Sequence, residues 1–297
     1  MSKPDSFVLI IGAMKCGTTS LFDVLSQHPE ICSARDKEPG FFVVDKDETN
    51  LLEYLGLWGW DKKIGHKYAL ESSVAYTQYP FVKGVPERIA QTALGKYRFI
   101  YLMRDPCSRI ESQVRHGLFA GWGKSLDAGI QKDAIDYSRY AMQMDEYLRF
   151  FPKESLFPIV LEDFKHEPHQ VLKEICAFLE IDRQYHFDNV AEPRNSGAFF
   201  ETHPLVRRLS QSPLASFVVS KLLPFRFKNW LRKKIATVGR KASKKHELGR
   251  WRLTEDEKYD VFEKLLPDLK RLESEYGIDI HKYWRIPSDR ADKSSTQ

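Results

Sequence analysis

Short apolar runs recur between residues 7 and 161, and two of them, 7–11 and 97–103, contain almost no polar residues. Runs of this kind are typical of parallel strands that are buried on both faces, whereas half-exposed strands alternate polar and apolar residues. The runs predict strands over 7–11, 67–71, 97–103 and 155–161, and a short strand or strand-like turn over 31–34.

Between and after these runs, apolar residues recur at the spacing of amphipathic helices. This spacing predicts helices over 18–29, from 85 onward, from 106 through 116, and over 133–151, 167–179 and 254–276. Pro86 and Pro106 suit a first helical turn. Thr254 and Glu257 have the spacing of a capping box, and Gly277 is expected to stop the last helix. Strands that alternate with helices predict the α/β class, with a central parallel sheet flanked by helices on both faces.

The first predicted strand runs into a loop that contains glycine and opens a helix. Gly12 ends the strand, Gly17 follows, and Lys15 lies between them. Backbone N–H groups of such a loop and of the first helical turn converge, and the helix dipole adds partial positive charge. Lys15 adds a full charge, and Thr18 and Thr19 add hydroxyl donors. The pattern predicts an anion site, but taken alone it fits a strand-to-helix turn without a ligand equally well.

The loop is close to the Walker A pattern GxxxxGK[ST] but departs from it in one place. From Gly12 the chain reads GAMKCGTT, so Thr18 follows the second glycine and the lysine, Lys15, lies inside the loop. A nucleoside triphosphatase needs this lysine on the β- and γ-phosphates and a Ser or Thr on magnesium. The displaced lysine therefore argues for a nucleotide with a different terminal group.

A second candidate anion site follows the strand over 97–103. Arg104 stands at the carboxyl end of this strand, Asp105 can cap the next helix, and Pro106 fits its first position. Ser112 lies two turns along that helix and can converge with Arg104 on one anion. A guanidinium makes two parallel hydrogen bonds to a phosphate, so this site suits a second phosphate group.

Together the two motifs resemble those of sulfotransferases that use 3′-phosphoadenosine 5′-phosphosulfate (PAPS). GAMKCGTTSL is similar to the 5′-phosphosulfate loop of that family, and the R-D-P-x-x-R-x-x-S pattern is similar to its 3′-phosphate site. The resemblance covers about 7–200 and is closest to the carbohydrate or heparan-type and bacterial branch. It implies a P-loop-like sulfotransferase fold, PAPS as donor, 3′-phosphoadenosine 5′-phosphate (PAP) as product, and no metal. The cofactor-binding residues that it implies are Lys15, Cys16, Gly17, Thr18, Thr19, Ser20, Arg104, Ser112 and, in a later loop, Gly197.

The resemblance also implies a general base. Heparan-type members carry a Glu three residues before a Phe-Phe pair, and Glu38 stands three residues before Phe41. Such a carboxylate can take the proton from an acceptor hydroxyl or amine that attacks sulfur, a task that burial would favour. Without the resemblance, the charged run over 35–40 would fit a solvated loop.

Two further residues complete the expected catalytic set. Lys15 would neutralise charge on the departing phosphate. His116 lies four residues after Ser112 on the same helix and matches a histidine near the acceptor in some N-sulfotransferases. A packed helical histidine is the alternative interpretation of His116. Arg109 and Arg115, on the same helix, are expected to be solvated or paired with acids.

One departure from the family bears on the acceptor. The segment 71–76 resembles the family's E-K-[TS]-P-x-Y, but Ser72 stands where heparan-type relatives have a lysine that contacts substrate. This difference argues against a highly sulfated, heparan-like acceptor. Trp58 and Trp60 could form a sugar-stacking face, but core packing is the favoured interpretation.

Composition is that of a globular chain, with 297 residues, 42% hydrophobic and 29% charged. We expect a single sulfotransferase domain, and the four cysteines, far apart and without a CxxC pair, predict neither a disulfide scaffold nor a zinc site. The early first strand leaves no room for a signal peptide, and no apolar run is long enough for a membrane span. These features predict a cytoplasmic protein. The expected parts are a PAPS-binding core over 5–200, a basic helical insertion over 201–252, a C-terminal helix and closing segment over 253–286, and a disordered tail over 287–297.

The basic insertion is the main compositional anomaly. Residues 207–252 hold 14 Lys or Arg and a single acid, Glu247. This charge fits a solvated face on packed helices, a wall that attracts an anionic acceptor, or a patch that rests on anionic lipid. No nucleic-acid-binding module matches the stretch, so nucleic acid is not an expected partner.

The sequence therefore predicts an enzyme that moves the sulfuryl group of PAPS in line to a hydroxyl or amine of an acceptor. The acceptor class expected is a carbohydrate, a glycan or a small molecule. Two alternatives stay open. One is a P-loop kinase of small molecules that uses ATP and magnesium, and the other is a non-enzymatic module that binds anions or a membrane surface.

Overall fold

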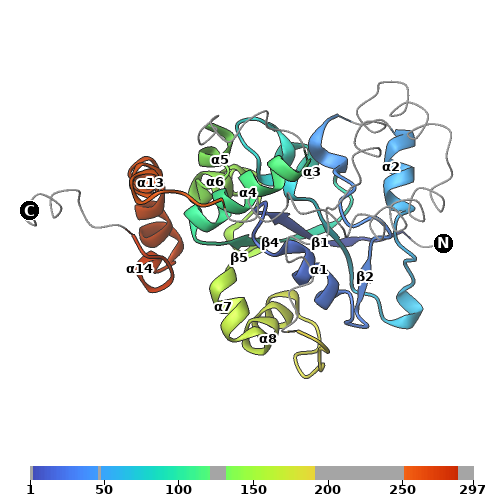
Figure 1. Ribbon diagram of the computed structural model, residues 1–297. Coiled ribbons are helices and arrows are strands. Elements are labelled where there is room, and N and C mark those ends of the chain that lie inside the picture. The colour runs from blue at the N-terminus through green and yellow to red at the C-terminus, as the bar shows by residue number, and fades with distance from the viewer. Residues whose placement is uncertain (1–2, 46–47, 121–131, 191–250, 287–297) are drawn as a thin grey trace, which may run out of the picture. The chain divides into compact units, whose positions relative to one another are not determined.

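The computed structural model describes residues 3–45, 48–120, 132–190 and 251–286 (Figure 1). By its internal contacts the chain divides into two compact units. The first comprises 1–113, 130–194 and 253–297, and the second comprises 114–129 and 195–252. Gly197, residues 201–250 of the expected basic insertion (201–252) and the tail from 287 lie outside the described residues, so the predictions for them stay predictions.

A five-stranded sheet forms the centre of the first unit, with the order β2-β3-β1-β4-β5. Every strand pair is parallel, as the near-continuous apolar runs predict. The strands are β1 (Ser6–Gly12), β2 (Ile31–Ser33), β3 (Tyr68–Ser72), β4 (Lys96–Met103) and β5 (Leu156–Val160). Residues 7–11 of the central strand β1 are fully buried. The carboxyl ends of all five strands meet at one edge of the sheet, which is where open α/β sheets bind ligands.

Helices flank this sheet (Figure 1). The described α-helices are α1 (Thr18–Leu25), α2 (Glu48–Leu55), α3 (Val85–Thr92), α4 (Pro106–Ala120), α5 (Lys132–Asp136), α6 (Tyr140–Leu148), α7 (Leu161–His166), α8 (Pro168–Leu179), α13 (Glu255–Tyr276) and α14 (Ile280–Tyr283). Short 3₁₀ turns are η1 (Phe41–Val43), η2 (Lys62–Ile64), η3 (Val74–Thr77) and η5 (Lys153–Ser155). The predicted α/β class with a central parallel sheet is confirmed.

Two helix predictions were wrong. The first helix ends at Leu25 and not near residue 29, because the N–H groups of Gln27 and His28 donate to the carbonyls three residues back and not four. The helix predicted over 133–151 is two helices, α5 and α6, with a break at 137–139. At the break, the buried Arg109 donates to Ser138 Oγ at 2.7 Å and to the carbonyl of Ala134.

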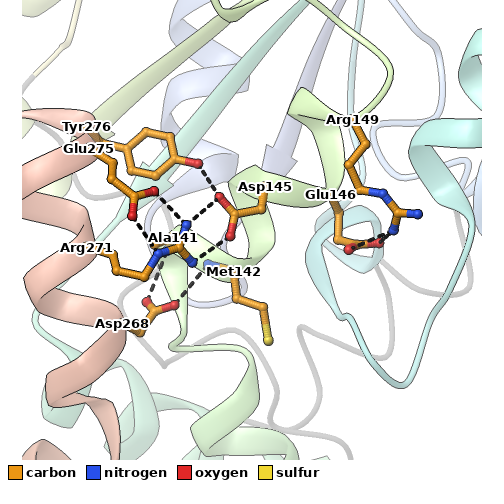
Figure 2. A network of polar contacts seen from close by, with 9 residues as sticks. All are labelled: Ala141, Met142, Asp145, Glu146, Arg149, Asp268, Arg271, Glu275 and Tyr276. Carbon is orange, nitrogen blue, oxygen red and sulfur yellow. Dashed lines mark hydrogen bonds and ion pairs between the residues drawn. The ribbon is translucent and has the colours of Figure 1, made fainter.

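The second of these helices has its own cap from a distant residue. Asp268 on α13 accepts hydrogen bonds from the N–H groups of Ala141 at 3.0 Å and Met142 at 2.9 Å (Figure 2). These two N–H groups belong to the first turn of α6 and have no partner within the helix. Asp268 is only 5% exposed, and burial raises the pKa of its carboxyl. A cap that lies so far along the chain leaves no local sequence signal.

The C-terminal helix α13 is bound to α6 by a further ion network (Figure 2). Arg271 donates to both oxygens of Asp145, at 2.7 and 3.1 Å, and also contacts Glu275 at 2.6 Å. Tyr276 donates its hydroxyl to Asp145 at 2.6 Å. A guanidinium with two parallel bonds to one carboxylate fixes orientation as well as distance. The network therefore fixes α13 against α6 within the first unit.

The ends of α13 are as the sequence predicts. The Thr254 N–H donates to Glu257 at 2.7 Å and the Glu257 N–H donates to Thr254 Oγ1 at 3.2 Å, so the capping box is confirmed. Gly277 ends the helix with a φ of 72°, a left-handed conformation that favours glycine.

Trp58 and Trp60 are each 4% exposed, which confirms core packing.

Among the helices that the structure describes, none combines the length and apolar character needed to cross a bilayer. All four cysteines are buried free thiols.

Candidate functional site

The loop between β1 and α1 has a shape that only glycine allows at two positions. Gly12 has a φ of 148°, and a Cβ there would lie 2.0 Å from Thr77 Oγ1. Gly17 has a φ of 88°, and a Cβ there would lie 2.8 Å from a methyl group of Leu161. Lys15 between them also has a positive φ, 71°. The two glycines therefore let the loop lie close to its neighbours and turn directly into the helix.

The first turn of α1 faces the same edge of the sheet. Its N-cap residue is Gly17, which has no side chain to cap the free N–H groups. Thr19 and Ser20 are half-buried, and Thr18 is 5% exposed. No acidic residue lies in this turn, so an anion there would meet the positive end of the helix dipole without a competing carboxylate.

The Cys16 side chain packs into the interior beneath the loop and is not exposed at its surface. Its side chain is fully buried, and its N–H donates to the carbonyl of Ala13 at 3.2 Å. Burial raises the pKa of the Cys16 thiol to about 12. At neutral pH it is a packed thiol and not a nucleophile.

The second motif lies beside this loop because β1 and β4 are paired neighbours in the sheet. Arg104 follows β4, and its Nη1 donates to the carbonyl of Lys15 at 3.4 Å. Tyr140 of α6 donates its hydroxyl to the carbonyl of Arg104 at 2.6 Å. Asp105 accepts from the N–H of Ser108 at 2.7 Å, which confirms the predicted cap of α4. The structure thus brings the two candidate anion motifs into contact.

Arg109 corrects one prediction. It is fully buried, and its guanidinium donates to Gln113 at 2.8 Å as well as to Ser138 and the Ala134 carbonyl. A longer contact of 3.5 Å reaches the carbonyl of Met14 in the β1–α1 loop. The expectation of a solvated or acid-paired side chain was wrong, because carbonyl, hydroxyl and amide oxygens surround its planar donors. Arg109 therefore supports the β1–α1 loop from the protein interior, through its contact with the Met14 carbonyl.

Three further α4 residues considered above, Ser112, Arg115 and His116, are half-buried. Ser112 lies in the first unit and His116 in the second. Arg115, in the second unit, donates to the carbonyl of Trp251 at 3.1 Å.

Glu38 lies in the loop that follows β2, and it is less buried than expected of a general base. Its side chain is 48% exposed and pairs with Lys37 Nζ at 2.5 Å. The loop is bound to the end of β3, since the N–H of Ser72 donates to the carbonyl of Lys37 at 2.9 Å. Glu38 therefore lies on the same carboxyl edge of the sheet as the other candidate residues, but it lacks their burial.

No role is predicted for Glu71 from the sequence, yet among the carboxylates that the structure describes at this edge its pKa is shifted furthest. Glu71 is fully buried at the end of β3 and accepts hydrogen bonds from Tyr54, Ser73 and Tyr76 at 2.9 to 3.2 Å. Burial raises its pKa from 4.5 to about 7, against the lowering effect of these bonds. A glutamate directly after the apolar run Tyr68–Leu70 was the available signal.

Within the described residues, no three His, Cys, Asp or Glu side chains come together as metal ligands would.

Three comparisons with known proteins bear on this site. A model of the sulfotransferase domain family matches residues 5–197. The bifunctional heparan sulfate N-deacetylase/N-sulfotransferase 3 of Homo sapiens is 24% identical over 201 residues, which cover 60% of this chain and 23% of that protein. The heparan sulfate glucosamine 3-O-sulfotransferase 5 of Mus musculus is 23% identical over 189 residues, which cover 58% of this chain and 53% of that protein. The chain thus spans 23% of the length of the first of these curated relatives and 53% of the length of the second.

A solved structure extends the similarity to the fold. The sulfotransferase from Alicyclobacillus acidocaldarius superposes with a TM-score of 0.63 and 20% identity, over 95% of this chain and 99% of that one. At this identity the likeness concerns the arrangement of the elements, which is the P-loop-like fold of sulfotransferases.

Proposed function

Because the chain belongs to the sulfotransferase domain family, we propose that it transfers the sulfuryl group of PAPS to a hydroxyl or amine of an acceptor. One observation carries the proposal: the contact of 3.4 Å between Arg104 Nη1 and the carbonyl of Lys15. It joins two cationic motifs at the carboxyl edge of neighbouring strands. A nucleotide with phosphate groups at both the 5′ and the 3′ position of its ribose needs two such motifs at once.

The residues fit this donor in two parts. The Lys15 ammonium, the N–H groups at the start of α1 and the hydroxyls of Thr18 and Thr19 suit the 5′-phosphosulfate. Arg104 and Ser112 suit the 3′-phosphate, which ATP lacks. When bound, PAPS supplies a sulfuryl group attached to a phosphate that can leave.

The proposed chemistry assigns one task to each side chain. The Glu38 carboxylate takes the proton from the acceptor hydroxyl or amine, whose oxygen or nitrogen forms the new bond to sulfur. The bond between sulfur and the phosphate oxygen breaks, and its electron pair stays on that oxygen. Lys15 neutralises the charge that develops there. We assign His116 a contact with the acceptor, on its place four residues after Ser112 in α4.

We propose a glycan as acceptor class. The support is that the names of two relatives contain heparan sulfate, and the chain matches each of these relatives over only part of its length. Ser72 in place of the family's lysine favours an acceptor less sulfated than heparan. The basic stretch over 203–252 is proposed to attract an anionic acceptor or a membrane surface. We place the enzyme in the cytoplasm, in keeping with its four widely spaced thiols.

Calorimetric titration with PAP, and separately with ATP and magnesium, tests the proposed donor. We expect PAP to bind without metal, and Arg104→Ala to weaken it roughly 10- to 100-fold, because a charged hydrogen-bond pair is lost. Arg149→Ala is the control, since Arg149 is exposed and pairs with Glu146 on α6. Binding of ATP with magnesium but not of PAP would instead support a P-loop kinase. Equal PAP affinity in Arg104→Ala would remove the 3′-phosphate assignment.

A further inference from the structure

A buried carboxylate is connected to the loop of Glu38 through two hydroxyl groups. We propose that Glu71 is a positioning residue for the general base, and that it holds the Glu38 loop in place through Ser73 and Tyr76. This inference rests on the proposed function for the role of Glu38, while the connection itself rests on the hydrogen bonds described below.

The Glu71 carboxylate collects three hydroxyl donors. Tyr54 and Tyr76 donate to Oε1 at 3.0 and 2.9 Å, and Ser73 donates to Oε2 at 3.2 Å. An ionised carboxylate only accepts hydrogen bonds, so each of these hydroxyls must point its proton at Glu71. Glu71 therefore fixes the orientation of all three hydroxyls.

Two of the three hydroxyls also accept hydrogen bonds from the backbone of the Glu38 loop. Ser73 Oγ accepts from the N–H of Gly40 at 3.1 Å, and the Tyr76 hydroxyl oxygen accepts from the N–H of Phe42 at 3.3 Å. Each hydroxyl has a single proton, which is committed to Glu71, so its lone pairs are free for these backbone donors. The donating N–H groups, those of Gly40 and Phe42, lie two and four residues after Glu38.

The loop is fixed on the other side of Glu38 as well. The N–H of Ser72, the residue after Glu71, donates to the carbonyl of Lys37 at 2.9 Å. Glu38 thus lies between two backbone groups, the carbonyl of Lys37 and the N–H of Gly40. Both are hydrogen-bonded to residues at the end of β3. A half-exposed side chain on a loop has many conformations, and anchors on both sides reduce that number.

The third hydroxyl supplies a built-in comparison. Tyr54 donates to the same Oε1 atom as Tyr76, but the described hydrogen bond of its hydroxyl goes to Glu71 and not to the loop backbone. Its ring stacks on Phe41 at a centroid distance of 4.3 Å, a contact that Tyr54→Phe keeps. Tyr54→Phe and Tyr76→Phe therefore each remove one hydroxyl from Glu71, and only the second removes an anchor of the loop.

Protonation of Glu71 would disturb the connection. Burial raises its pKa to about 7, so the group changes charge near neutral pH. A protonated carboxyl has a donor of its own, and a hydroxyl that accepts from it must turn its proton elsewhere. The titratable groups around Glu71 are Asp36, Tyr54, Tyr76, Tyr97 and Tyr147; burial raises the pKa of all four tyrosines, so they stay neutral in this range.

Amide hydrogen exchange of the full chain, followed residue by residue by NMR at pH 8, tests the connection without any acceptor. We expect Tyr76→Phe to speed exchange of the Phe42 amide, and Ser73→Ala that of the Gly40 amide, each by roughly tenfold for one lost hydrogen bond. Tyr54→Phe should leave both amides protected. In the unsubstituted chain the protection should fall below pH 7, and Glu71→Gln should remove this pH dependence. Equal exchange in Tyr54→Phe and Tyr76→Phe would overturn the inference.

Turnover separates the inference from the proposed function. With PAPS and a de-N-sulfated heparan oligosaccharide as probe, Tyr76→Phe should lower kcat with an unchanged KM for PAPS, while Tyr54→Phe keeps both. A rise in KM for PAPS, or equal losses of kcat in the two variants, would contradict a role at Glu38. PAP titration reports on the proposed function alone: failure of the unsubstituted chain to bind PAP would overturn that function, and the exchange result would still decide whether Glu71 holds the loop.

Discussion

Burial determines the chemistry of individual side chains around the β1–α1 loop. Cys16 and Glu71 are both fully buried, and the pKa of each is raised because the charged form loses its hydration. Cys16 is inert for that reason, with a pKa of about 12. Glu71 is different, because a pKa of about 7 lets both protonation states occur near neutral pH. Glu38, by contrast, is half-exposed and depends on its loop for position.

The pKa of Glu71 makes the stability of the fold depend on pH. Its value in the folded protein lies above the ordinary 4.5, so its contribution is fully present below pH 4.5 and is lost as pH rises through about 7. The loss should be on the order of 3 kcal/mol. Glu71→Gln should abolish this contribution in urea unfolding at pH 5 and pH 8, while Glu53→Gln, on the exposed side of α2, should not. If the free energy of unfolding depended on pH in the same way in Glu71→Gln and in the unsubstituted protein, Glu71 would not be the source of this pH dependence.

The proposed base is tested by its nearest neutral analogue. Glu38→Gln keeps the shape of the side chain but cannot take a proton, so we expect kcat to fall by roughly 10²- to 10⁴-fold. PAP affinity, measured by calorimetry, should be unchanged because Glu38 is assigned to the acceptor. Lys37→Gln removes the ion-pair partner and not the base, and is the matched control. Full transfer by Glu38→Gln would exclude Glu38 as the base.

At the scale of single elements, the tightest constraint lies where the β1–α1 loop turns into the helix. Gly17 combines a φ of 88° with close approach to Leu161, and both features oppose any side chain. Gly59 is the matched comparison, since a Cβ there would meet nothing within 4 Å. The same substitution should therefore have different effects at the two sites.

We expect Gly17→Ala to lower the free energy of unfolding by about 1 to 3 kcal/mol, since it combines left-handed backbone with a steric clash. Gly59→Ala should change it by less than about 0.5 kcal/mol, as is usual for surface positions. Urea unfolding monitored by circular dichroism measures both values. Equal stability of the two variants would show that the loop can adjust around an added methyl group.

The elements that the sequence predicted well are those with local causes. The five strands, the capping box of Thr254 and the Gly277 stop depend on neighbouring residues, and all were found. The two candidate anion motifs each follow a buried strand, so their common edge could be predicted. The break between α5 and α6 depends on Arg109 and Asp268, which lie far away in the chain, so periodicity alone predicted one helix. Glu71 was missed because the sequence pattern does not show that the hydroxyls of Tyr54, Ser73 and Tyr76 meet at one buried carboxylate.

At the scale of the whole molecule, the C-terminal helix is connected to the candidate site through α6. Asp268 on α13 caps α6, and Tyr140 at the start of α6 donates to the carbonyl of Arg104 at 2.6 Å. Residues from the end of the chain thus support a motif that follows β4. Support of this kind reaches the site without any contact with the ligand.

Removal of the Asp268 cap measures this support. Asp268→Ala leaves two N–H groups of α6 without their acceptor, and we expect a loss of about 1 to 3 kcal/mol in the free energy of unfolding. Glu146→Ala breaks the exposed pair with Arg149 on the same helix and should cost less than about 1 kcal/mol. Figure 2 shows both sites. Thermal unfolding of the two variants should rank them in this order, and a reversed ranking would contradict the role of Asp268.

The central position of β1 also has a consequence for the order of assembly during synthesis. Phe7 pairs with Ala69 on one side and with Tyr97 on the other, so β1 leaves the ribosome before either of its partner strands. Until β4 has been made, Lys15 has no Arg104 beside it and one edge of β1 is exposed. Such non-local pairing slows folding and leaves an open strand edge that invites aggregation. A nascent chain cut before residue 96 should therefore be a client of chaperones, and binding competence should arise only after the second motif has emerged.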